Sequence, residues 1–372
     1  MIYFDNAATT WKKPPAVLSA MRQAVSIYGG NPGRSSHALS LAASEQIDGV
    51  RCEIAELFSL PHPDHVVFCQ NATHALNLAI KSRAKRGMHI LISDREHNAV
   101  YRPVCRLAQD GIADFDVFST RENPLENILS LLRPNTGMLV CNHISNVDGA
   151  VAPIGEIAAL CRERGIYFII DASQSAGHMP LTFAKGCEPD ALCAPGHKGL
   201  FGVQGCGFVW LRDGEGLSTL LEGGSGNASR LPTMPTTLPE RMEAGTLPTP
   251  AILSLGAGVR FIREVSTEAI AAHESTLGDR LCDRLADTRG MHIFRGARGG
   301  VVSLTSDRIT PDALTAALDS RAVCVRGGLH CAPLAHAAIG TEESGTVRVS
   351  FCYFNTKAEV DRFANILLSL LS

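Results

Sequence analysis

Two stretches in the middle of the chain decide its fold. They are residues 169–177, IIDASQSAG, and residues 195–202, PGHKGLFG. In the first, Asp171 ends an apolar run that is typical of a strand buried on both faces of a sheet. In the second, Lys198 follows a further apolar run, in a turn that is rich in glycine. Ligands of parallel sheets bind at the carboxyl ends of strands, so we expect the acid and the lysine to meet there.

Outward from these stretches, short apolar runs alternate with segments of helical period. The expected strands are residues 66–69, 89–93, 138–142, 167–171, 191–194 and 207–211, and the expected helices are residues 72–86 and 154–164. This alternation predicts an α/β fold with a mostly parallel sheet that is covered on both faces. Asn71, His97, Asn146 and Asp171 lie at or just past the carboxyl ends of such strands.

The last third of the chain has a different pattern. Residues 222–250 are rich in Gly, Pro, Ser and Thr, which predicts a long irregular segment. A helix at about 251–286 precedes strands at 301–304 and 347–354 and helices at 311–320 and 357–371, which describe a smaller α+β unit. We therefore expect a large domain over residues 15–260 and a small C-terminal domain over residues 261–372, packed together with residues 1–14.

Composition limits the classes of partner and compartment. The 372 residues carry a formal net charge of -3, which gives no reason to expect nucleic acid or an acidic membrane surface as a partner. No apolar run approaches the length of a membrane span, and we see no signal-peptide pattern at the start. The twelve cysteines are scattered without a Cys-x-x-Cys pair, so we expect free thiols in a reducing, cytoplasmic setting.

Asp171 and Lys198 together are the groups that pyridoxal phosphate requires. A lysine amine binds the cofactor covalently, and a carboxylate holds a proton on the pyridine nitrogen so that the ring can accept electrons. Lysines are mostly surface residues, and an acid after a strand can simply cap a helix. The capping alternative does not explain why an acid ends so apolar a strand.

With these residues the chain resembles the class V fold-type I enzymes that depend on pyridoxal phosphate, and among them the cysteine desulfurases. The resemblance runs from DNAATT at residues 5–10 to FNT at residues 354–356. It implies a fold-type I transferase, a homodimer, and the conversion of L-cysteine to L-alanine. It also implies a sulfur-acceptor protein, as in iron–sulfur cluster assembly. The C-terminal loop has no long insertion, and in this respect the chain resembles the second, short-loop group of cysteine desulfurases.

The cofactor phosphate has an expected site at the start of the helix that begins at residue 72. Free backbone N–H groups at a helix start, here those of Ala72 and Thr73, favour an anion. A capping threonine without a ligand is the alternative. The resemblance implies two further phosphate ligands: His197, and Thr246 contributed by the neighbouring subunit.

Three polar residues are expected around the cofactor ring, each by resemblance. Gln174 is similar to the residue that hydrogen-bonds the phenolic oxygen. His97 is similar to a histidine that stacks on the pyridine ring and relays protons. Asn146 is similar to an asparagine near the phenolic oxygen and the substrate carboxylate. From spacing alone, His97 is equally a polar surface residue and Asn146 a turn residue.

Cys331 lies in residues 325–333, VRGGLHCAP, close to Arg326 and a histidine. Positive neighbours raise the fraction of thiolate, which is the nucleophilic form of cysteine. The segment resembles the sulfur-accepting loop of the desulfurases, which implies that Cys331 takes the sulfur as a persulfide. The spacing of His330, Cys331 and His336 does not reproduce a usual zinc pattern, so we expect no metal.

The substrate carboxylate has one expected clamp and two expected neighbours. Alternation along residues 347–351 places Arg348 on the opposite face from the apolar residues beside it. A guanidinium can hold a carboxylate with two parallel hydrogen bonds, and the position resembles the carboxylate clamp of the family. Arg326 is a second expected substrate-binding residue. His37 is a third, because residues 31–37, NPGRSSH, resemble an N-terminal active-site loop.

Two positions depart from the family pattern. Pro195 stands where the family usually has a hydroxyl residue that helps to bind the phosphate, and Leu329 stands where the second group usually has a histidine. These departures keep other functions open. The alternatives are a selenocysteine lyase or another pyridoxal-phosphate lyase of sulfur amino acids, a class V aminotransferase, and a non-catalytic sulfur-relay or scaffold protein.

Overall fold

The computed structural model describes residues 1–33, 36–183, 186–296 and 299–371. Its largest sheet has seven strands in the order β2-β8-β7-β6-β5-β3-β4. They are β2 (Val66–Cys69), β3 (Met88–Ser93), β4 (Ala113–Phe118), β5 (Thr136–Asn142), β6 (Tyr167–Asp171), β7 (Ala191–Pro195) and β8 (Gly207–Leu211). All neighbouring pairs from β4 to β7 are parallel, whereas β8 is antiparallel to both of its neighbours. The expected mostly parallel sheet is confirmed.

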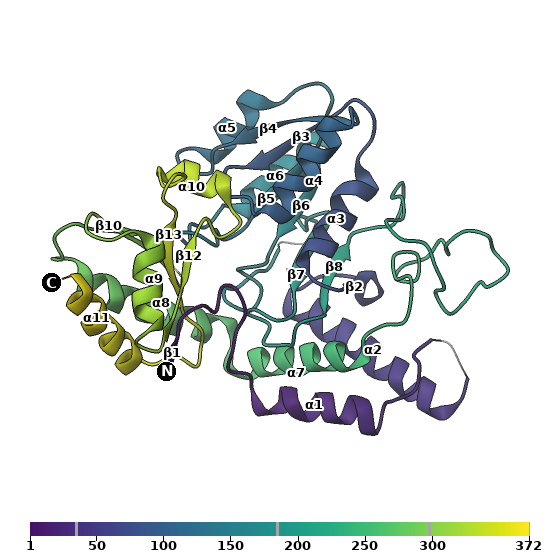
Figure 1. The fold of residues 1–372 in the computed structure, drawn as a ribbon. Helices are drawn as coiled ribbons and strands as arrows, with labels where there is room; N and C mark the ends of the chain where they lie inside the picture. Colours follow the sequence, from purple (N-terminus) through teal and green to yellow (C-terminus); the bar gives the residue numbers. More distant parts are fainter. Residues whose placement is uncertain (34–35, 184–185, 297–298, 372) are drawn as a thin grey trace.

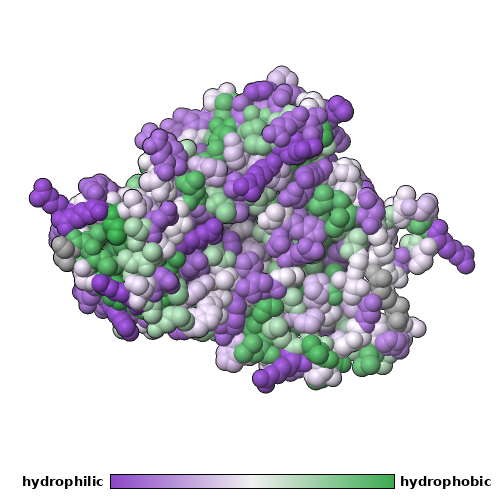
Figure 2. Space-filling view, viewed as in Figure 1, coloured by the Kyte–Doolittle hydropathy of each residue, from purple (hydrophilic) through white to green (hydrophobic). Residues whose placement is uncertain are grey.

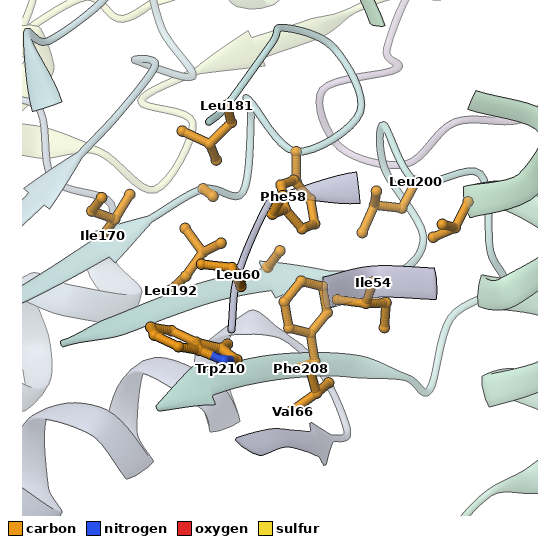
Figure 3. Close-up of a cluster of buried hydrophobic side chains, with 14 of the residues drawn as sticks. Ile54, Phe58, Leu60, Val66, Ile170, Leu181, Leu192, Leu200, Phe208 and Trp210 are labelled. Carbon is orange, nitrogen blue, oxygen red and sulfur yellow. The ribbon is translucent and has the colours of Figure 1, made fainter. Parts of the chain in front are cut away.

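Helices cover both faces of this sheet because successive side chains of each strand point to opposite sides. Ile170 and Leu192 face a core that includes residues of α1 (Pro15–Ser26), α2 (Ala38–Leu57), α5 (Pro124–Leu131), α6 (Ile154–Arg164) and α7 (Thr249–Val265). Their neighbours Ile169 and Cys193 face a second core with α3 (Ala72–Arg83) and α4 (Asn98–Gln109). Figure 3 shows part of the first core, where Phe208 and Trp210 project from β8 into the same cluster as Phe58, which follows α2.

A smaller unit lies beside the large sheet (Figure 1). Its antiparallel sheet has the order β12-β13-β10-β9. The strands are β9 (Met291–Phe294), β10 (Val301–Ser306), β12 (Arg326–Gly328) and β13 (Thr346–Ser350), and the helices of this part are α8 (Thr267–Leu285), α9 (Pro311–Asp319), α10 (Pro333–Ile339) and α11 (Lys357–Leu371). The N-terminal β1 (Ile2–Tyr3) pairs with β11 (Val323–Cys324). Ile2 and Phe4 are buried in the same core as α8, α9 and α11.

The prediction of a single helix at about residues 251–286 is wrong, because the structure has two helices there. Ser266 separates α7 from α8, with a φ of 73° that no helix contains, and its side chain accepts from the N–H of Ala269 to cap α8. α7 packs against α1 and α2 in the large unit, whereas Leu277 and Leu281 of α8 lie in the core of the small unit. This packing supports a domain boundary near Ser266, a few residues after the expected one, and the division stays a proposal.

Other expected elements differ at their ends. The helix expected to reach residue 86 ends at Arg83, and the strand expected to reach residue 354 ends at Ser350. Residues 222–248 contain no helix or strand, as expected. All twelve cysteines are free thiols. Among the described residues there is no helix long and apolar enough to cross a membrane.

Candidate active site

The turn that carries Lys198 is fixed by backbone contacts on two sides. Gly202 donates its N–H to the carbonyl of Gly196 at 2.8 Å, and Phe201 donates to the carbonyl of Lys198 at 3.0 Å, which close the turn after β7. From the other side, Thr10 Oγ1 donates to the Lys198 carbonyl at 2.9 Å. The N-terminal segment therefore holds the backbone of the lysine in place.

With the exception of Thr246, the residues expected to bind the cofactor line one cavity of about 100 Å³ at the carboxyl ends of the strands. Nine residues that sequence patterns or the resemblance singled out line it: Asn71, Ala72, Thr73, His97, Asn146, Asp171, Gln174, His197 and Lys198. Ala99, Asn142, Ser173 and Pro195 form the rest of the wall. The structure thus brings together residues from four strand ends and from the lysine turn.

Lys198 and Asp171 have the electrostatic setting that a reactive amine requires. Burial lowers the pKa of Lys198 to about 8, and the carboxylate of Asp171 opposes this shift. The neutral and nucleophilic form of the amine is therefore far more populated near neutral pH than in an ordinary lysine. Asp171 is 1% exposed, and its Oδ1 accepts the N–H of Ser173 at 2.9 Å.

The start of α3 forms one end of the cavity. The side chain of Asn71 caps the helix by accepting the N–H of His74 at 3.0 Å. The N–H groups of Ala72 and Thr73 belong to the first turn, where no earlier carbonyl of the helix can accept them. They line the cavity together with His197, whose Nδ1 lies 3.1 Å from Thr9 Oγ1. This end of the cavity is suited to an anion.

His97 is held as a neutral imidazole. Its Nδ1 accepts the N–H of Ala99 at 3.0 Å at the start of α4, so Nε2 carries the proton. Burial, with Lys198 as the next cause, lowers the pKa of His97 to about 4. The preceding Glu96 is fully buried and fixes this loop, because its Oε1 accepts from Ser93 Oγ at 2.5 Å and from the N–H of Asn142 at 2.7 Å.

Cys331 lies at the rim, in a loop anchored twice to the large unit. The N–H of Asn98 donates to the Cys331 carbonyl at 2.7 Å, and Asn146 Nδ2 donates to the His330 carbonyl at 2.9 Å. His330 and Cys331 have left-handed φ values of 50° and 58°, a strained pair for residues with side chains. The exposed thiol lies 3.5 Å from the Arg326 guanidinium.

Arg348 lies beside Arg326, because the two residues are directly paired across β13 and β12. Its side chain is 1% exposed. Nη2 donates to Asp5 Oδ1 at 2.9 Å and Nη1 donates to the Asn146 carbonyl at 3.0 Å. Among the described residues, Nε of Arg348 has no hydrogen-bond partner. Neither arginine lines the cavity that contains Lys198, so their expected role toward a substrate carboxylate stays a prediction.

Five expected site residues do not line this cavity: Cys331, Arg326 and Arg348, described above, and also His37 and Thr246. His37 is exposed and caps α2, where its Nδ1 accepts the N–H of Ser40 at 3.2 Å. Thr246 is exposed in the irregular segment before α7. Neither residue lines the cavity that contains Lys198. Their expected roles, His37 toward the substrate and Thr246 toward the phosphate of a neighbouring subunit, stay predictions.

The two histidines near Cys331 have partners other than a metal. Nε2 of His330 lies 2.9 Å from Thr346 Oγ1, and Nδ1 of His336 lies 2.7 Å from Thr341 Oγ1. Within the described part of the chain, one group of side chains has the spacing of a metal site: His62, Asp64 and His65, just before β2.

Comparison with known proteins identifies the family. Residues 2–363 match the model of the family described as aminotransferase class-V. The chain belongs to the aminotransferase class-V family. A probable cysteine desulfurase of Xylella fastidiosa is 33% identical to it over 385 residues, which cover 100% of this chain and 91% of that protein. A probable cysteine desulfurase of Streptomyces coelicolor is 31% identical, over 97% of this chain and 90% of the relative.

A solved structure of the same family has nearly the same fold. The apo structure of a cysteine desulfurase from Thermococcus onnurineus NA1 matches with a TM-score of 0.91 and 28% sequence identity. The match covers 100% of this chain and 94% of that chain. The expected fold class and the resemblance to cysteine desulfurases are therefore confirmed over the full length.

The aminotransferase class-V family implies pyridoxal phosphate as cofactor, and the cavity has the donor set that this cofactor needs. The buried Lys198 amine suits its aldehyde, the Asp171 carboxylate suits its pyridine nitrogen, and the start of α3 suits its phosphate. In addition, the buried Asn142 Oδ1 and Asn146 Oδ1 lack hydrogen-bond partners among the described residues, although both residues line the cavity. Polar groups on a ligand would satisfy them.

Sequence reasoning missed the part that the N-terminal segment plays in this class-V site. Asp5 holds Arg348, Thr10 holds Lys198, and Lys13 Nζ donates to the His197 carbonyl at 3.1 Å. Gln174 Nε2 also donates to the Ala7 carbonyl, at 3.0 Å. The polar residues within residues 5–13 indicate that this segment has a role beyond packing. However, nothing in it indicates which distant residues it contacts.

Proposed function

We propose that this protein is a pyridoxal-phosphate-dependent cysteine desulfurase that converts L-cysteine to L-alanine and accepts the sulfur on Cys331. The observation that carries the proposal is the position of the Cys331 thiol. It is exposed beside Arg326, in a loop whose backbone is bound to Asn98, next to His97 of the cofactor cavity. A nucleophilic thiol at this rim has a task in sulfur transfer and none in amino-group transfer.

In this proposal Arg348 and Arg326 bind the α-carboxylate of the substrate. The two arginines are directly paired on neighbouring strands, and Asn146 bonds to both the Arg348 guanidinium and the Cys331 loop. A carboxylate fixed by a guanidinium fork also fixes the orientation of the α-carbon. Asn146 therefore links substrate position to the position of the nucleophilic loop.

Lys198 is the proposed carrier of the α-proton. When bound, pyridoxal phosphate acts as the electron sink for the substrate α-carbon. Burial gives Lys198 a pKa of about 8, so its amine can accept a proton and return it near neutral pH. His97, neutral and with its proton on Nε2, can donate a hydrogen bond into the cavity.

The sulfur step consumes one thiolate. The Cys331 sulfur attacks the substrate sulfur, the S–S bond forms as the substrate C–S bond breaks, and the electron pair of that bond goes to the β-carbon, which takes a proton. The products are L-alanine and a persulfide on Cys331. We further propose a protein acceptor for this sulfur, a role in iron–sulfur cluster assembly, a homodimer and a cytoplasmic location, each from the family resemblance.

Two alternatives remain, a selenocysteine lyase or other sulfur-amino-acid lyase, and a non-catalytic relay protein. Pro195 lines the cavity at a position where the family usually has a hydroxyl group. A loss of cofactor binding caused by this proline would favour the non-catalytic relay protein. A visible absorption spectrum of the purified protein, before and after addition of L-cysteine, decides between catalysis and relay. A band that shifts on cysteine, with alanine formed, is the expected result.

The same spectrum and alanine assay test the roles of individual residues. Cys331→Ala should abolish alanine formation from cysteine while retaining the band, whereas Cys52→Ala, at another exposed thiol, should retain both. Lys198→Ala should lose turnover altogether. Full activity in Cys331→Ala would contradict the persulfide step, and activity on selenocysteine alone would favour the lyase.

A further inference from the structure

The exposed side of Cys331 opens into a second cavity of about 350 Å³ that is separate from the substrate clamp. It adjoins the cofactor cavity, because Thr73, His97 and Ala99 line both. Its charged lining residues are all cations, namely Lys81, Arg102 and Arg106, and its lining includes no carboxylate. We call this cavity the basic basin.

The cations lie in two rows that lead away from Cys331. Asn77 and Lys81 follow Thr73 at intervals of four along α3, and Arg102 and Arg106 follow Asn98 at intervals of four along α4. Residues four apart share one face of a helix, so each row is a single stripe. The two helices pack against each other, and hydrophilic side chains gather over α4 (Figure 2).

Both helices begin at the end of the basin where Cys331 lies. The N–H of Asn98, the first residue of α4, donates to the Cys331 carbonyl, and α3 begins at Ala72. Helix N-termini carry a partial positive charge. The eight residue steps of α4 from Asn98 to Arg106 span about 12 Å. The basin is thus positive from the thiol outward over the length of a short peptide segment.

Little of this charge is neutralised within the chain. Arg106 Nε pairs with Asp110 at 2.8 Å, and both groups are exposed. Lys81 and Arg102 form no salt bridge in the described part of the chain. The protein as a whole has a formal net charge of -3. A local surplus of positive charge around a nucleophile, on a weakly acidic protein, selects an anionic partner.

We propose that the basic basin binds the carboxylates of an acidic segment that carries the thiol of the sulfur-acceptor protein. This inference rests on the proposed function, since it assigns a partner to the persulfide of Cys331. The acceptor thiolate attacks the outer sulfur of that persulfide. A new S–S bond forms on the acceptor, the S–S bond to Cys331 breaks, and its electron pair stays on Cys331 Sγ as a thiolate.

Free cysteine does not fit the basin as well as it fits the clamp. Its carboxylate has Arg348 and Arg326 at the buried junction, and its own ammonium group is repelled by three cations. An acidic segment has several carboxylates without that ammonium group. It can therefore contact both rows of cations while its thiol reaches Cys331.

The first test uses the holoenzyme with its persulfide formed from labelled cysteine and the excess removed. Three cysteine peptides of equal length, flanked by glutamate, serine or lysine, then discharge the label in single-turnover reactions. We expect the glutamate peptide to react at least about tenfold faster than the lysine peptide at low salt, and this difference to fall at about 0.5 M salt. Equal rates for the three peptides would overturn the proposal.

Charge-reversal variants test whether the cations of the basic basin cause this difference in rate. Lys81→Glu and Arg102→Glu together should lower the rate with the glutamate peptide several-fold and raise the rate with the lysine peptide. Alanine formation with a neutral thiol as reductant should not change. Lys85→Glu/Arg86→Glu is the matched control, since both residues are exposed cations just beyond α3 that do not line the basin. An equal loss in the control variant would contradict a local site.

A second measurement does not depend on desulfurase activity. Cys331 can be titrated with dithiobis(nitrobenzoate), a dianionic disulfide, and with cystamine, a dicationic disulfide, in the protein and in Cys331→Ala to identify the signal. The charge preference is the ratio of the dianion rate to the dication rate divided by the same ratio for free cysteine, because dithiobis(nitrobenzoate) has the better leaving thiolate and reacts faster with any thiol. We expect this preference to favour the dianion, and the Lys81→Glu/Arg102→Glu variant to lose it. A preference for the dianion without alanine formation would support the basin and contradict the proposed function. No charge preference would overturn the basin itself.

Discussion

The guanidinium of Arg348 is held by the carboxylate of Asp5, with Nη2 2.9 Å from Oδ1. The two residues lie at opposite ends of the sequence, and the contact joins the N-terminal segment to β13. Burial lowers the pKa of Arg348, and the charge of Asp5 opposes this effect. Asp5 therefore keeps a fully buried cation charged and fixes its direction, although the geometry gives Asp5 no role in the reaction itself.

Removing the Asp5 carboxylate should weaken substrate binding more than turnover. In Asp5→Ala the Arg348 side chain loses a partner that orients it, so we expect the KM for L-cysteine to rise about tenfold, with kcat changed less than about threefold. Asp5→Asn keeps an oxygen acceptor and should stay close to the original KM. Steady-state kinetics of the three proteins measures this. An unchanged KM in Asp5→Ala would show that Asn146 alone positions Arg348.

Lys198 should make the stability of the cofactor-free protein depend on pH. Its pKa is lowered from 10.5 to about 8 by burial, so the unfolded chain binds more protons between these two values. The free energy of unfolding therefore rises with pH across this window. Below pH 8 the cost of the buried charge is constant, and above pH 10.5 it is gone.

The variant Lys198→Met provides the reference for that prediction, because it has no amine to titrate. The stability of the original protein relative to Lys198→Met should rise by about 3 kcal/mol between pH 8 and pH 10.5. Urea denaturation at a series of pH values measures the difference. A constant difference across the window would mean that the amine is not buried in the absence of cofactor.

Much of the large unit could be predicted from the sequence because its strands are apolar on both faces. The expected ranges for β2, β6 and β8 agree with the structure at every residue. β4 was missed because it lies at the edge of the sheet and alternates apolar with acidic residues, such as Asp114 and Asp116. The two helices around Ser266 were merged because apolar periodicity continues across a break of one residue.

The candidate site was predictable where the residues follow strand ends, as Asp171 and His97 do. It was not predictable where the contact depends on chain folding over long distances. Asp5 and Arg348 are a residue pair of this kind, and the basic basin is a second example. Lys81 and Arg106 each look like part of a solvated helix face in the sequence. Only the packing of α3 against α4 places them in the lining of one cavity with Cys331.

The buried ion pair between Arg51 and Glu243 should make the stability of the protein sensitive to a single substitution at either residue. Arg51 Nη1 and Nη2 each lie 2.8 Å from an oxygen of Glu243, and the Phe68 N–H donates to the same carboxylate at 2.6 Å. Burial raises the pKa of Glu243 in spite of Arg51, which shows how costly its charge is in this place.

We expect Arg51→Met to destabilise the protein by about 3–5 kcal/mol, because Glu243 is then buried without its cation. The double variant Arg51→Met/Glu243→Leu should lose less than Arg51→Met alone, since it removes the uncompensated charge as well. Midpoints of urea denaturation measure both changes. A double variant that is less stable than Arg51→Met would mean that Glu243 stabilises the protein even without its cation, for example by accepting the Phe68 N–H.

A glycine in α7 determines how closely the lysine turn can approach this helix. A Cβ added at Gly258 would lie 1.9 Å from the Leu200 carbonyl oxygen, two residues beyond Lys198. Since real Cβ atoms do not approach so closely, Gly258→Ala must push the turn away from α7. We expect a loss of about 1–3 kcal/mol in stability and a weaker affinity for pyridoxal phosphate.

Gly155→Ala in α6 is the matched control, because a Cβ there meets no atom within 4 Å. It should leave cofactor affinity unchanged and raise the free energy of unfolding by about 0.4–1 kcal/mol, since alanine restricts the unfolded chain. Titration with the cofactor, followed by its absorption band, and urea denaturation measure the two effects. If Gly258→Ala loses stability but binds the cofactor as well as Gly155→Ala does, the turn relaxes without moving the Lys198 amine. The close approach then serves packing alone.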